Sequence, residues 1–258
     1  MTPGPEDPPL HELDPTSRFS DRAEDYVKYR PGYPLAAIDA ILRGLGDPAS
    51  LTVADIGAGT GIAARQLAAR GARLIAVEPN PDMRAAAAPH PRIEWREGTA
   101  ESTRLGEASV DLVVCAQAFH WFRPAAALAE FRRILRPRGR LVLLWNNRDR
   151  DDALTRGYIE AIHAVNGEHP AERRAFDPEL VHRDGGFTPA RLERYAHDQE
   201  LDRDGLVGRA LSASYVPRTG EPHAALLRLL GALFERHHDA HGRLRLRYVT
   251  NVWNAERT

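Results

Sequence analysis

The sequence has little cysteine, little lysine and almost no net charge. Among 258 residues, one is cysteine (Cys115) and one is lysine (Lys28), and 35 basic side chains face 36 acidic ones. A single cysteine forms neither an internal disulfide nor a cysteine-rich metal site, so we expect no metal centre. The net charge of −1 argues against a protein that binds nucleic acid over a broad face.

Long apolar runs are absent as well. No stretch approaches the roughly 18–20 residues that span a bilayer. The first 15 residues are rich in proline and acidic side chains and lack the basic start and apolar run of a signal peptide. We therefore expect a cytoplasmic protein without a membrane partner, in which residues 1–16 form a disordered tail. The oligomeric state is left open.

The pattern of apolar residues divides the rest, 17–258, into three parts of one domain. Residues 17–50 read as a cap of two helices, with Phe19, Ala23 and Tyr26 on one helical face. In residues 51–147, nearly all-apolar strands alternate with helices, which predicts a parallel sheet covered on both faces. Residues 148–258 add helices and final strands, the last one antiparallel.

The residue ranges of these elements follow from periodicity, caps and glycine or proline punctuation. We expect strands at 51–56, 73–78, 92–97, 110–116, 140–145, 191–197 and 243–253, and helices at 60–69, 83–88, 124–135, 152–165, 205–215 and 224–237. Residues 171–186 read as irregular. The predicted fold is a Rossmann-like α/β fold with a mixed seven-stranded sheet, in which the amino-terminal helices and residues 148–186 form a lid and an acceptor pocket.

The most informative segment joins the first strand to the following helix. It contains Asp55-Ile56-Gly57-Ala58-Gly59-Thr60-Gly61. Glycines at a strand–helix turn let the backbone approach a bound nucleoside. A dinucleotide fingerprint needs its third glycine one residue later than Gly61. The acidic Asp55 would repel a pyrophosphate but suits a ligand that carries an ammonium group.

Glu78 closes the second strand, 19 residues after Gly59. A carboxylate at that strand end can accept both hydroxyls of a ribose. The alternative is a charge that stabilises the start of the helix after Asn80 through the helix dipole.

This combination resembles the class I S-adenosylmethionine-dependent methyltransferases. Similar features continue in Gly98-Thr99-Ala100-Glu101, in the segment from Asp111 to Phe122, and in Leu135-Arg136-Pro137-Arg138-Gly139. The leading Phe19…Tyr26…Arg30-Pro31-Gly32-Tyr33-Pro34 together with Ala118-Phe119-His120-Trp121-Phe122 is similar to a small-molecule subgroup, methyltransferase type 11, that includes trans-aconitate and cantharidin methyltransferase-like proteins. The resemblance covers about residues 17–147.

The resemblance implies S-adenosyl-L-methionine as cofactor, S-adenosyl-L-homocysteine as product and a small-molecule acceptor. The cofactor-binding positions that it implies are Tyr26, Arg30, Asp55, Gly57, Ala58, Gly59, Thr60, Glu78, Pro79, Met83, Ala100, Glu101, Gln117, Ala118 and Phe119. Aromatic faces can hold the sulfonium cation. Tyr26, Phe119 and Trp121 are the candidates, with ordinary packing as the alternative. Arg30 can bind a carboxylate of cofactor or substrate, or lie on the surface beside a turn.

His120 is the candidate catalytic residue. It follows the fourth strand, at the edge where open α/β sheets bind ligands, and could deprotonate an acceptor hydroxyl. The alternative is a histidine that shapes the pocket. Trp121, Trp145, Asn146 and Asn147 are candidates for acceptor contacts, and the asparagines could equally cap a turn.

Two other functions remain open at this stage. One is a nicotinamide-dependent oxidoreductase, which the early third glycine disfavours. The other is a non-catalytic protein that binds S-adenosylmethionine. The sequence lacks the Asn/Asp-Pro-Pro-aromatic segment of many amide- and base-methylating relatives. We therefore expect transfer to an oxygen of a small molecule.

Overall fold

A computed structural model describes residues 23–169 and 176–258. The predicted tail, the start of the first predicted helix with Phe19, and residues 171–175 of the predicted irregular segment lie outside the described residues. The helices are α1 (Ala23–Tyr29), α2 (Leu35–Leu42), α3 (Ile62–Ala68), α4 (Pro81–Ala85), α5 (Pro124–Ile134), α6 (Ala153–Asn166), α8 (Glu179–His182), α9 (Arg203–Leu211) and α10 (Gly220–His237), with short 3-10 turns η3 (Pro48–Ser50) and η4 (Phe119–Trp121).

The strands form one mixed sheet in the order β3-β2-β1-β4-β5-β7-β6. They are β1 (Thr52–Ile56), β2 (Arg73–Val77), β3 (Ile93–Arg96), β4 (Val110–Ala116), β5 (Leu135–Arg148), β6 (Arg191–Leu201) and β7 (Leu244–Glu256). Strands β1 to β5 pair in parallel, and β7 runs antiparallel to both β5 and β6. The predicted mixed seven-stranded α/β fold is confirmed.

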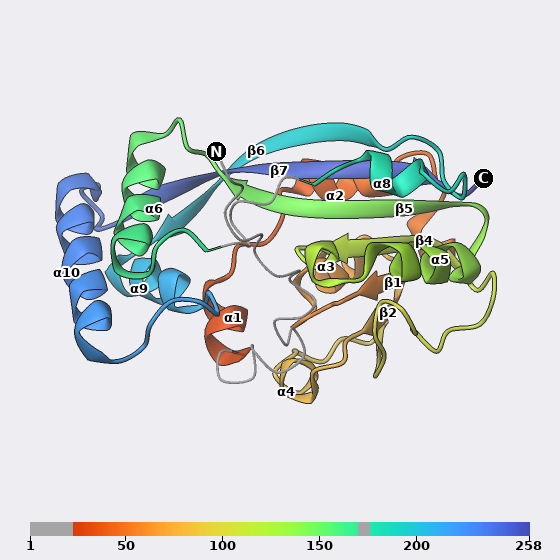
Figure 1. The fold of residues 1–258 in the computed structure, drawn as a ribbon, viewed down its shortest axis with the longest axis horizontal. Helices are drawn as coiled ribbons and strands as arrows, with labels where there is room; N and C mark the ends of the chain where they lie inside the picture. Colours follow the sequence, from red (N-terminus) through yellow and green to blue (C-terminus); the bar gives the residue numbers. More distant parts are fainter. Residues whose placement is uncertain (1–22, 170–175) are drawn as a thin grey trace, which may run out of the picture.

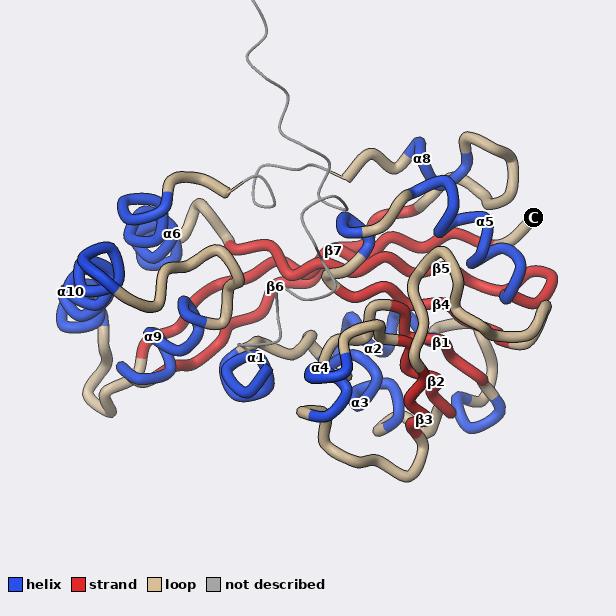
Figure 2. The backbone as a smooth tube through the Cα atoms, turned by 60° about the horizontal axis from the view of Figure 1, so that its bottom comes forward, coloured by secondary structure: helices blue, strands red, loops and turns tan. Residues whose placement is uncertain are grey.

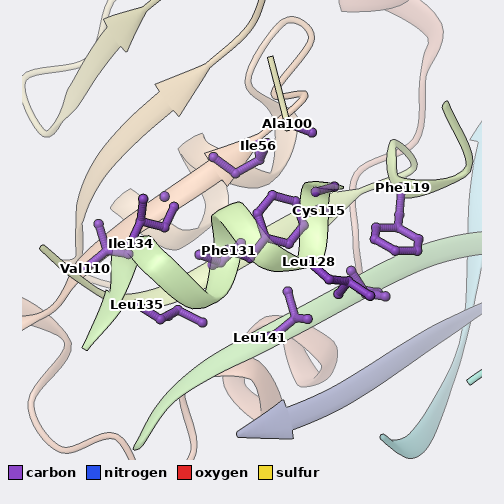
Figure 3. Close-up of a cluster of buried hydrophobic side chains, with 14 of the residues drawn as sticks. Ile56, Ala100, Val110, Cys115, Phe119, Leu128, Phe131, Ile134, Leu135 and Leu141 are labelled. Atoms are coloured by element: carbon purple, nitrogen blue, oxygen red, sulfur yellow. The ribbon is translucent and has the colours of Figure 1, made fainter. Parts of the chain in front are cut away.

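Two apolar cores lie on opposite faces of the sheet. Helices α5 and α8 cover one face, where Phe131 and Ile134 pack on Cys115 and Leu141, as Figure 3 shows for this cluster. Helices α2 and α3 cover the other face (Figure 2). Burial on both faces explains why β1 and β4 are almost wholly apolar.

A third core lies where the sheet extends beyond its parallel part. It joins α6, α9 and α10 to the ends of β6 and β7, around Tyr158, Leu206 and Tyr248. Figure 1 shows these three helices gathered at one end of the molecule, with β5, β6 and β7 running toward them. The strand β5 continues after Leu144, the partner of the last residue of β4, because β7 pairs with it as far as Arg148. Residues 145–148 therefore project past the carboxyl edge of the parallel strands.

Several predicted boundaries were wrong, each for a local reason. The helix expected from Thr60 begins at Ile62, because Gly61 caps it in the left-handed region with φ +76°. Helix α9 starts two residues early, since Asp202 accepts a hydrogen bond from the backbone N–H of Gly205. The segment read as irregular contains the short helix α8.

Candidate functional site

The glycine loop lies at the carboxyl edge of β1 in a conformation that needs glycine. Gly57, Gly59 and Gly61 all have positive φ, at +68°, +57° and +76°. The N–H groups of Gly57 and Ala58 donate to the carbonyl of Val77 at 2.9 and 3.2 Å. A Cβ at Gly57 would lie 2.8 Å from the Cβ of Ala118. The loop is therefore held between the end of β2 and the segment after β4.

Glu78 is fixed at the end of β2 by two backbone N–H groups. Its Oε2 accepts from Gly59 at 2.9 Å and its Oε1 from Asn80 at 2.9 Å. The side chain is buried, which raises the pKa of its carboxyl. Each oxygen keeps a second lone pair, so the carboxylate can still accept hydroxyl groups. Glu78 thus anchors the glycine loop, a role that sequence reasoning missed. Its predicted role as acceptor for the ribose hydroxyls stays a prediction.

Buried polar atoms without partners cluster beneath the same loop. Asp55 is fully buried, and its Oδ2 accepts from the N–H of Ala64 at 3.1 Å. Burial raises the pKa of this carboxyl to about 7. Its Oδ1 and the Thr60 hydroxyl have no hydrogen-bond partner within the described chain. Buried polar atoms without partners are rare and costly, so the loop has hydrogen-bonding capacity for a ligand.

The remaining predicted cofactor positions differ in their distance from the loop and in their burial. Met83 and Tyr26 approach from the side, since a Cβ at Gly59 would meet Met83 Cε at 3.4 Å and Tyr26 Cε1 at 3.9 Å. Ala100 lies in the core, and the Glu101 carboxylate accepts from the backbone N–H of Arg123 at 2.9 Å. The Pro79 carbonyl accepts from Arg84 at 2.9 Å.

Helix α1 brings Tyr26 and Arg30 beside the loop. The Arg30 guanidinium lies over the Tyr26 ring, 4.7 Å from its centroid, and donates to the carbonyl of Ser212 at 3.1 Å. Its Nε is buried without a partner in the described residues. Arg30 therefore connects the edge of the glycine loop to the segment after α9, and the surface alternative for it is wrong.

A cavity of about 790 Å³ opens next to this loop. Its wall includes Phe122, whose ring would lie 2.9 Å from a Cβ at Gly57. The predicted site residues that line it are Tyr26, Arg30, Gln117, Phe119, His120, Trp121, Trp145, Asn146 and Asn147. Residues far apart in the sequence thus meet at one place, and every predicted acceptor contact is among them.

The hydrogen bond between His120 and Trp145 fixes the tautomer of the histidine. Trp145 Nε1 lies 3.2 Å from His120 Nδ1. An indole N–H only donates, so Nδ1 accepts and the neutral imidazole carries its proton on Nε2. In this arrangement His120 offers a donor at Nε2. A base that acts through Nε2 would need the other tautomer and would lose the bond to Trp145.

Asn146 joins four separate segments at the rim of the cavity. Its Nδ2 donates to the Gly32 carbonyl at 3.0 Å, and its Oδ1 accepts from Thr250 at 2.6 Å and lies 3.3 Å from His197 Nε2. Its backbone carbonyl accepts from Gln117 at 3.2 Å. Both polar ends of its side chain are thus engaged within the protein, and Asn146 holds the rim together.

Sequence reasoning missed part of the lining. The missed residues come mainly from the carboxy-terminal half and include Arg148, Phe176, Arg209, Tyr215 and Trp253. One signal was available for Trp253. It shares a strand face with Asn251, two residues away, and pairs with Leu143 on the strand that carries Trp145. Nothing in the sequence alone indicated that α9 reaches the site.

Comparison with known proteins agrees with this geometry. Residues 54–143 match the family described as "Methyltransferase domain". An uncharacterized methyltransferase of Mycobacterium tuberculosis is 36% identical over 203 residues, which cover 76% of each chain. A protein from Anaeromyxobacter dehalogenans, solved as a candidate type II methyltransferase, is 27% identical with a TM-score of 0.61 over 89% of this chain and 98% of that one.

A further structure shares the fold at lower identity. The [4+2]-cyclase SpnF aligns over 97% of both chains with a TM-score of 0.56 and 16% identity. Helices long and apolar enough to cross a membrane do not occur in the described ranges 23–169 and 176–258.

The chain belongs to the class I S-adenosylmethionine-dependent methyltransferases. It is an enzyme whose cofactor is S-adenosyl-L-methionine. The alternative of a nicotinamide-dependent oxidoreductase is therefore wrong. The residues fit this group. At Gly59 a Cβ would enter the space between Met83 and Tyr26, Glu78 presents oxygen acceptors, and Asp55 and Thr60 have unused buried polar atoms.

Proposed function

We propose that this enzyme methylates an oxygen atom of a small-molecule acceptor held in the 790 Å³ cavity. The observation that carries the proposal is the position of this cavity beside the glycine loop. Cavities of roughly 300–1,000 Å³ suit small organic ligands. Phe122 lines the cavity and would contact a Cβ at Gly57, so the acceptor pocket and the loop share a wall.

The residues of the chain have two tasks in such a reaction. S-adenosylmethionine supplies a methyl group on a sulfonium, which is a strong leaving group. The protein must align the acceptor in line with that methyl and exclude water. Phe119 is buried, and its ring meets those of Phe122 and Phe176 edge to face at 6.1 and 5.9 Å. This aromatic wall supports a dry, shaped pocket and can face a cation.

The polar groups of the cavity favour oxygen as the acceptor atom. The lining includes Arg30, Arg148 and Arg209. Donors orient oxygen ligands, whereas a protonated amine would meet repulsion from these guanidiniums. The missing Asn/Asp-Pro-Pro-aromatic segment points the same way.

The test is turnover of S-adenosylmethionine against a library of acids, phenols and amines, with product masses and fragmentation read out. We expect methyl esters or ethers among the products. A library that yields only N-methylated products would contradict the proposal. Competing DNA and RNA oligonucleotides serve as controls, because we also propose that nucleic acid is not a partner and that the enzyme works in the cytoplasm. The near-zero net charge supports the former and the scarcity of cysteine the latter.

A further inference from the structure

Three arginines come together at one end of the acceptor cavity. Arg30 follows α1, Arg148 ends β5 and Arg209 lies on α9, and all three line the cavity. Arg209 is almost fully buried, with 4% of its surface exposed, and its Nε donates to the Tyr248 hydroxyl at 3.1 Å. Arg148 lies over the Tyr158 ring, 5.1 Å from its centroid.

The positive charges affect one another. Burial, together with the charges of Arg209 and Arg148, lowers the pKa of Arg30 to about 10. Burial raises the pKa of Tyr158, and the charges of the same three guanidiniums partly offset this rise. Three cations thus lie within electrostatic reach of one another in a partly desolvated place, where repulsion is weakly screened.

No carboxylate of the described chain neutralises Arg30 or Arg209. Their hydrogen-bond partners are the Ser212 carbonyl and hydroxyl and the Tyr248 hydroxyl. Asp177 is the one acidic residue in the described lining, and its carboxylate lies 3.5 Å from Arg183 and accepts from the N–H of Glu179.

Two buried polar atoms near these arginines have no partner in the described ranges. They are the Nε of Arg30 and the hydroxyl of the fully buried Tyr158. Uncompensated buried charges and unpartnered donors cost stability, and an oxyanion in the cavity would compensate Arg30, which lines it. Arginine is suited to this because its planar fork binds two oxygens at once.

The lining also contains a cluster of aromatic side chains. Phe176 contacts Trp145 and Trp253, with ring centroids 5.0 and 5.3 Å apart. A ligand that matches both the aromatic cluster and the arginines has an apolar body and an oxyanion.

We propose that the acceptor is an organic acid with an apolar body, whose oxyanion is anchored by Arg30, Arg148 and Arg209. This inference rests on the proposed function and names its substrate class. The anchored group and the atom that receives the methyl are separate questions, so the test measures binding. A carboxylate of the cofactor would neutralise at most one of Arg30 and Arg209, the two guanidiniums that no carboxylate of the described chain neutralises, which leaves a positive charge for the acceptor.

The experiment is calorimetry on the full chain saturated with S-adenosylhomocysteine. The probes are indole-3-acetate and decanoate, each paired with its neutral amide. We expect both acids to bind, each at least tenfold more tightly than its amide, with affinities that fall as salt rises. Equal affinity of acid and amide, or no binding of either acid, would overturn the proposal.

Variants assign the effect to the arginines. Arg148→Gln should weaken binding of the acids by tenfold or more, the loss expected for a hydrogen bond to a charged group. Arg150→Gln is the matched control, because Arg150 lines the same cavity and its guanidinium already pairs with Glu168 at 3.3 Å. Its affinity for the acids should stay within about twofold. Thermal unfolding checks that both variants fold. Equal losses in the two variants would contradict the assignment.

A last comparison separates the acceptor from the cofactor. Arg148→Gln should bind S-adenosylhomocysteine and 5′-methylthioadenosine, which lacks the amino-acid part, as the wild type does. If only S-adenosylhomocysteine binds more weakly, Arg148 serves the cofactor carboxylate and the proposal is wrong. If neutral acceptors alone are methylated, the inference fails while the proposed function stands. If the acids bind but the turnover library yields only N-methylated products, the proposed function fails while the anion site stands.

Discussion

Backbone conformation at single residues determines whether the glycine loop can accept a cofactor. The loop uses positive φ at three glycines, and one of them lies where a side chain would enter the space between Met83 and Tyr26. Motif spacing predicted this loop and the carboxylate at Glu78, because both depend on local chain geometry. It did not predict that Glu78 also holds the N–H of Gly59.

Gly59→Val should abolish binding of S-adenosylhomocysteine while the protein still folds. The left-handed conformation at φ +57° costs a non-glycine residue roughly 1–2 kcal/mol, and the branched side chain fills the ligand space. Calorimetry measures the binding and circular dichroism the fold. Gly242→Val is the control, because Gly242 has φ +68° with open space around its would-be Cβ. Gly242→Val has the same backbone strain and should bind S-adenosylhomocysteine normally. Similar losses of affinity in the two variants would mean that backbone strain alone is the cause.

Asp55 makes the stability of the ligand-free protein depend on pH. Its pKa is about 7 in the fold and about 3.9 in an unfolded chain, so between these values the folded state holds more protons. This group's contribution to the free energy of unfolding therefore falls as pH rises from about 4 to about 7. Asp55→Asn keeps an acceptor for the Ala64 N–H and cannot titrate.

As pH rises from about 5 to about 8, the free energy of unfolding of Asp55→Asn should increase relative to that of the wild type by about a few kcal/mol. Urea unfolding of both proteins at several pH values measures this difference. Parallel stability curves would mean that Asp55 titrates normally.

His120 should contribute to turnover as a donor and a wall of the pocket. Because its Nδ1 accepts from Trp145, we expect His120→Ala to lose less than about tenfold in turnover, below the roughly 10²–10⁴-fold of general-base catalysis. The pH profile from about 6 to 9 should match that of the wild type. His120→Asn can retain an acceptor for the indole N–H and should lose less than the alanine variant. Loss of a wild-type rise near the histidine pKa would instead establish a base.

At the scale of elements, the sequence was most informative where packing repeats a simple pattern. Strands buried on both faces, such as β4, were predicted with their observed ends, because apolar runs stop where the chain leaves the core. Strand β5 is longer than the predicted 140–145 at both ends, and its residues 146–148 are stabilised by pairing with β7. That pairing depends on residues about 100 positions away, which no local pattern encodes.

The difference between local patterns and long-range packing also explains which residues of the site could be predicted from the sequence. Residues that directly follow β2 and β4, and residues near the end of β5, were predicted, because parallel strands end at a common edge. Arg209 and Tyr215 come from α9 and the turn after it, and their place depends on how the third core packs on β6 and β7. Helix periodicity indicates a buried face but not the partner of that face.

At the scale of the whole molecule, α1 connects the glycine loop to α9 and β6. Tyr26 lies beside the glycine loop, while Tyr29 packs on α9 and its carbonyl accepts from Gln199 on β6 at 2.8 Å. Asp25 pairs with Arg218, and Arg30 donates to Ser212. Figure 2 shows α1 between the helices around α9 and those around α4. A change on α9 should therefore reach the cofactor site through α1.

Gly208→Ala tests this connection. A Cβ at Gly208 would overlap the Tyr29 ring, so α1 or α9 must move. We expect S-adenosylhomocysteine to bind at least several-fold more weakly, because Tyr26 and Arg30 move with α1. Calorimetry measures the affinity. Gly231→Ala is the control, since Gly231 also lies in a helix of the third core and its Cβ would meet only the flexible end of Arg203, at 3.2 Å. Unchanged cofactor affinity in Gly208→Ala, with a lower melting temperature, would show that α1 supports the fold without positioning the cofactor site.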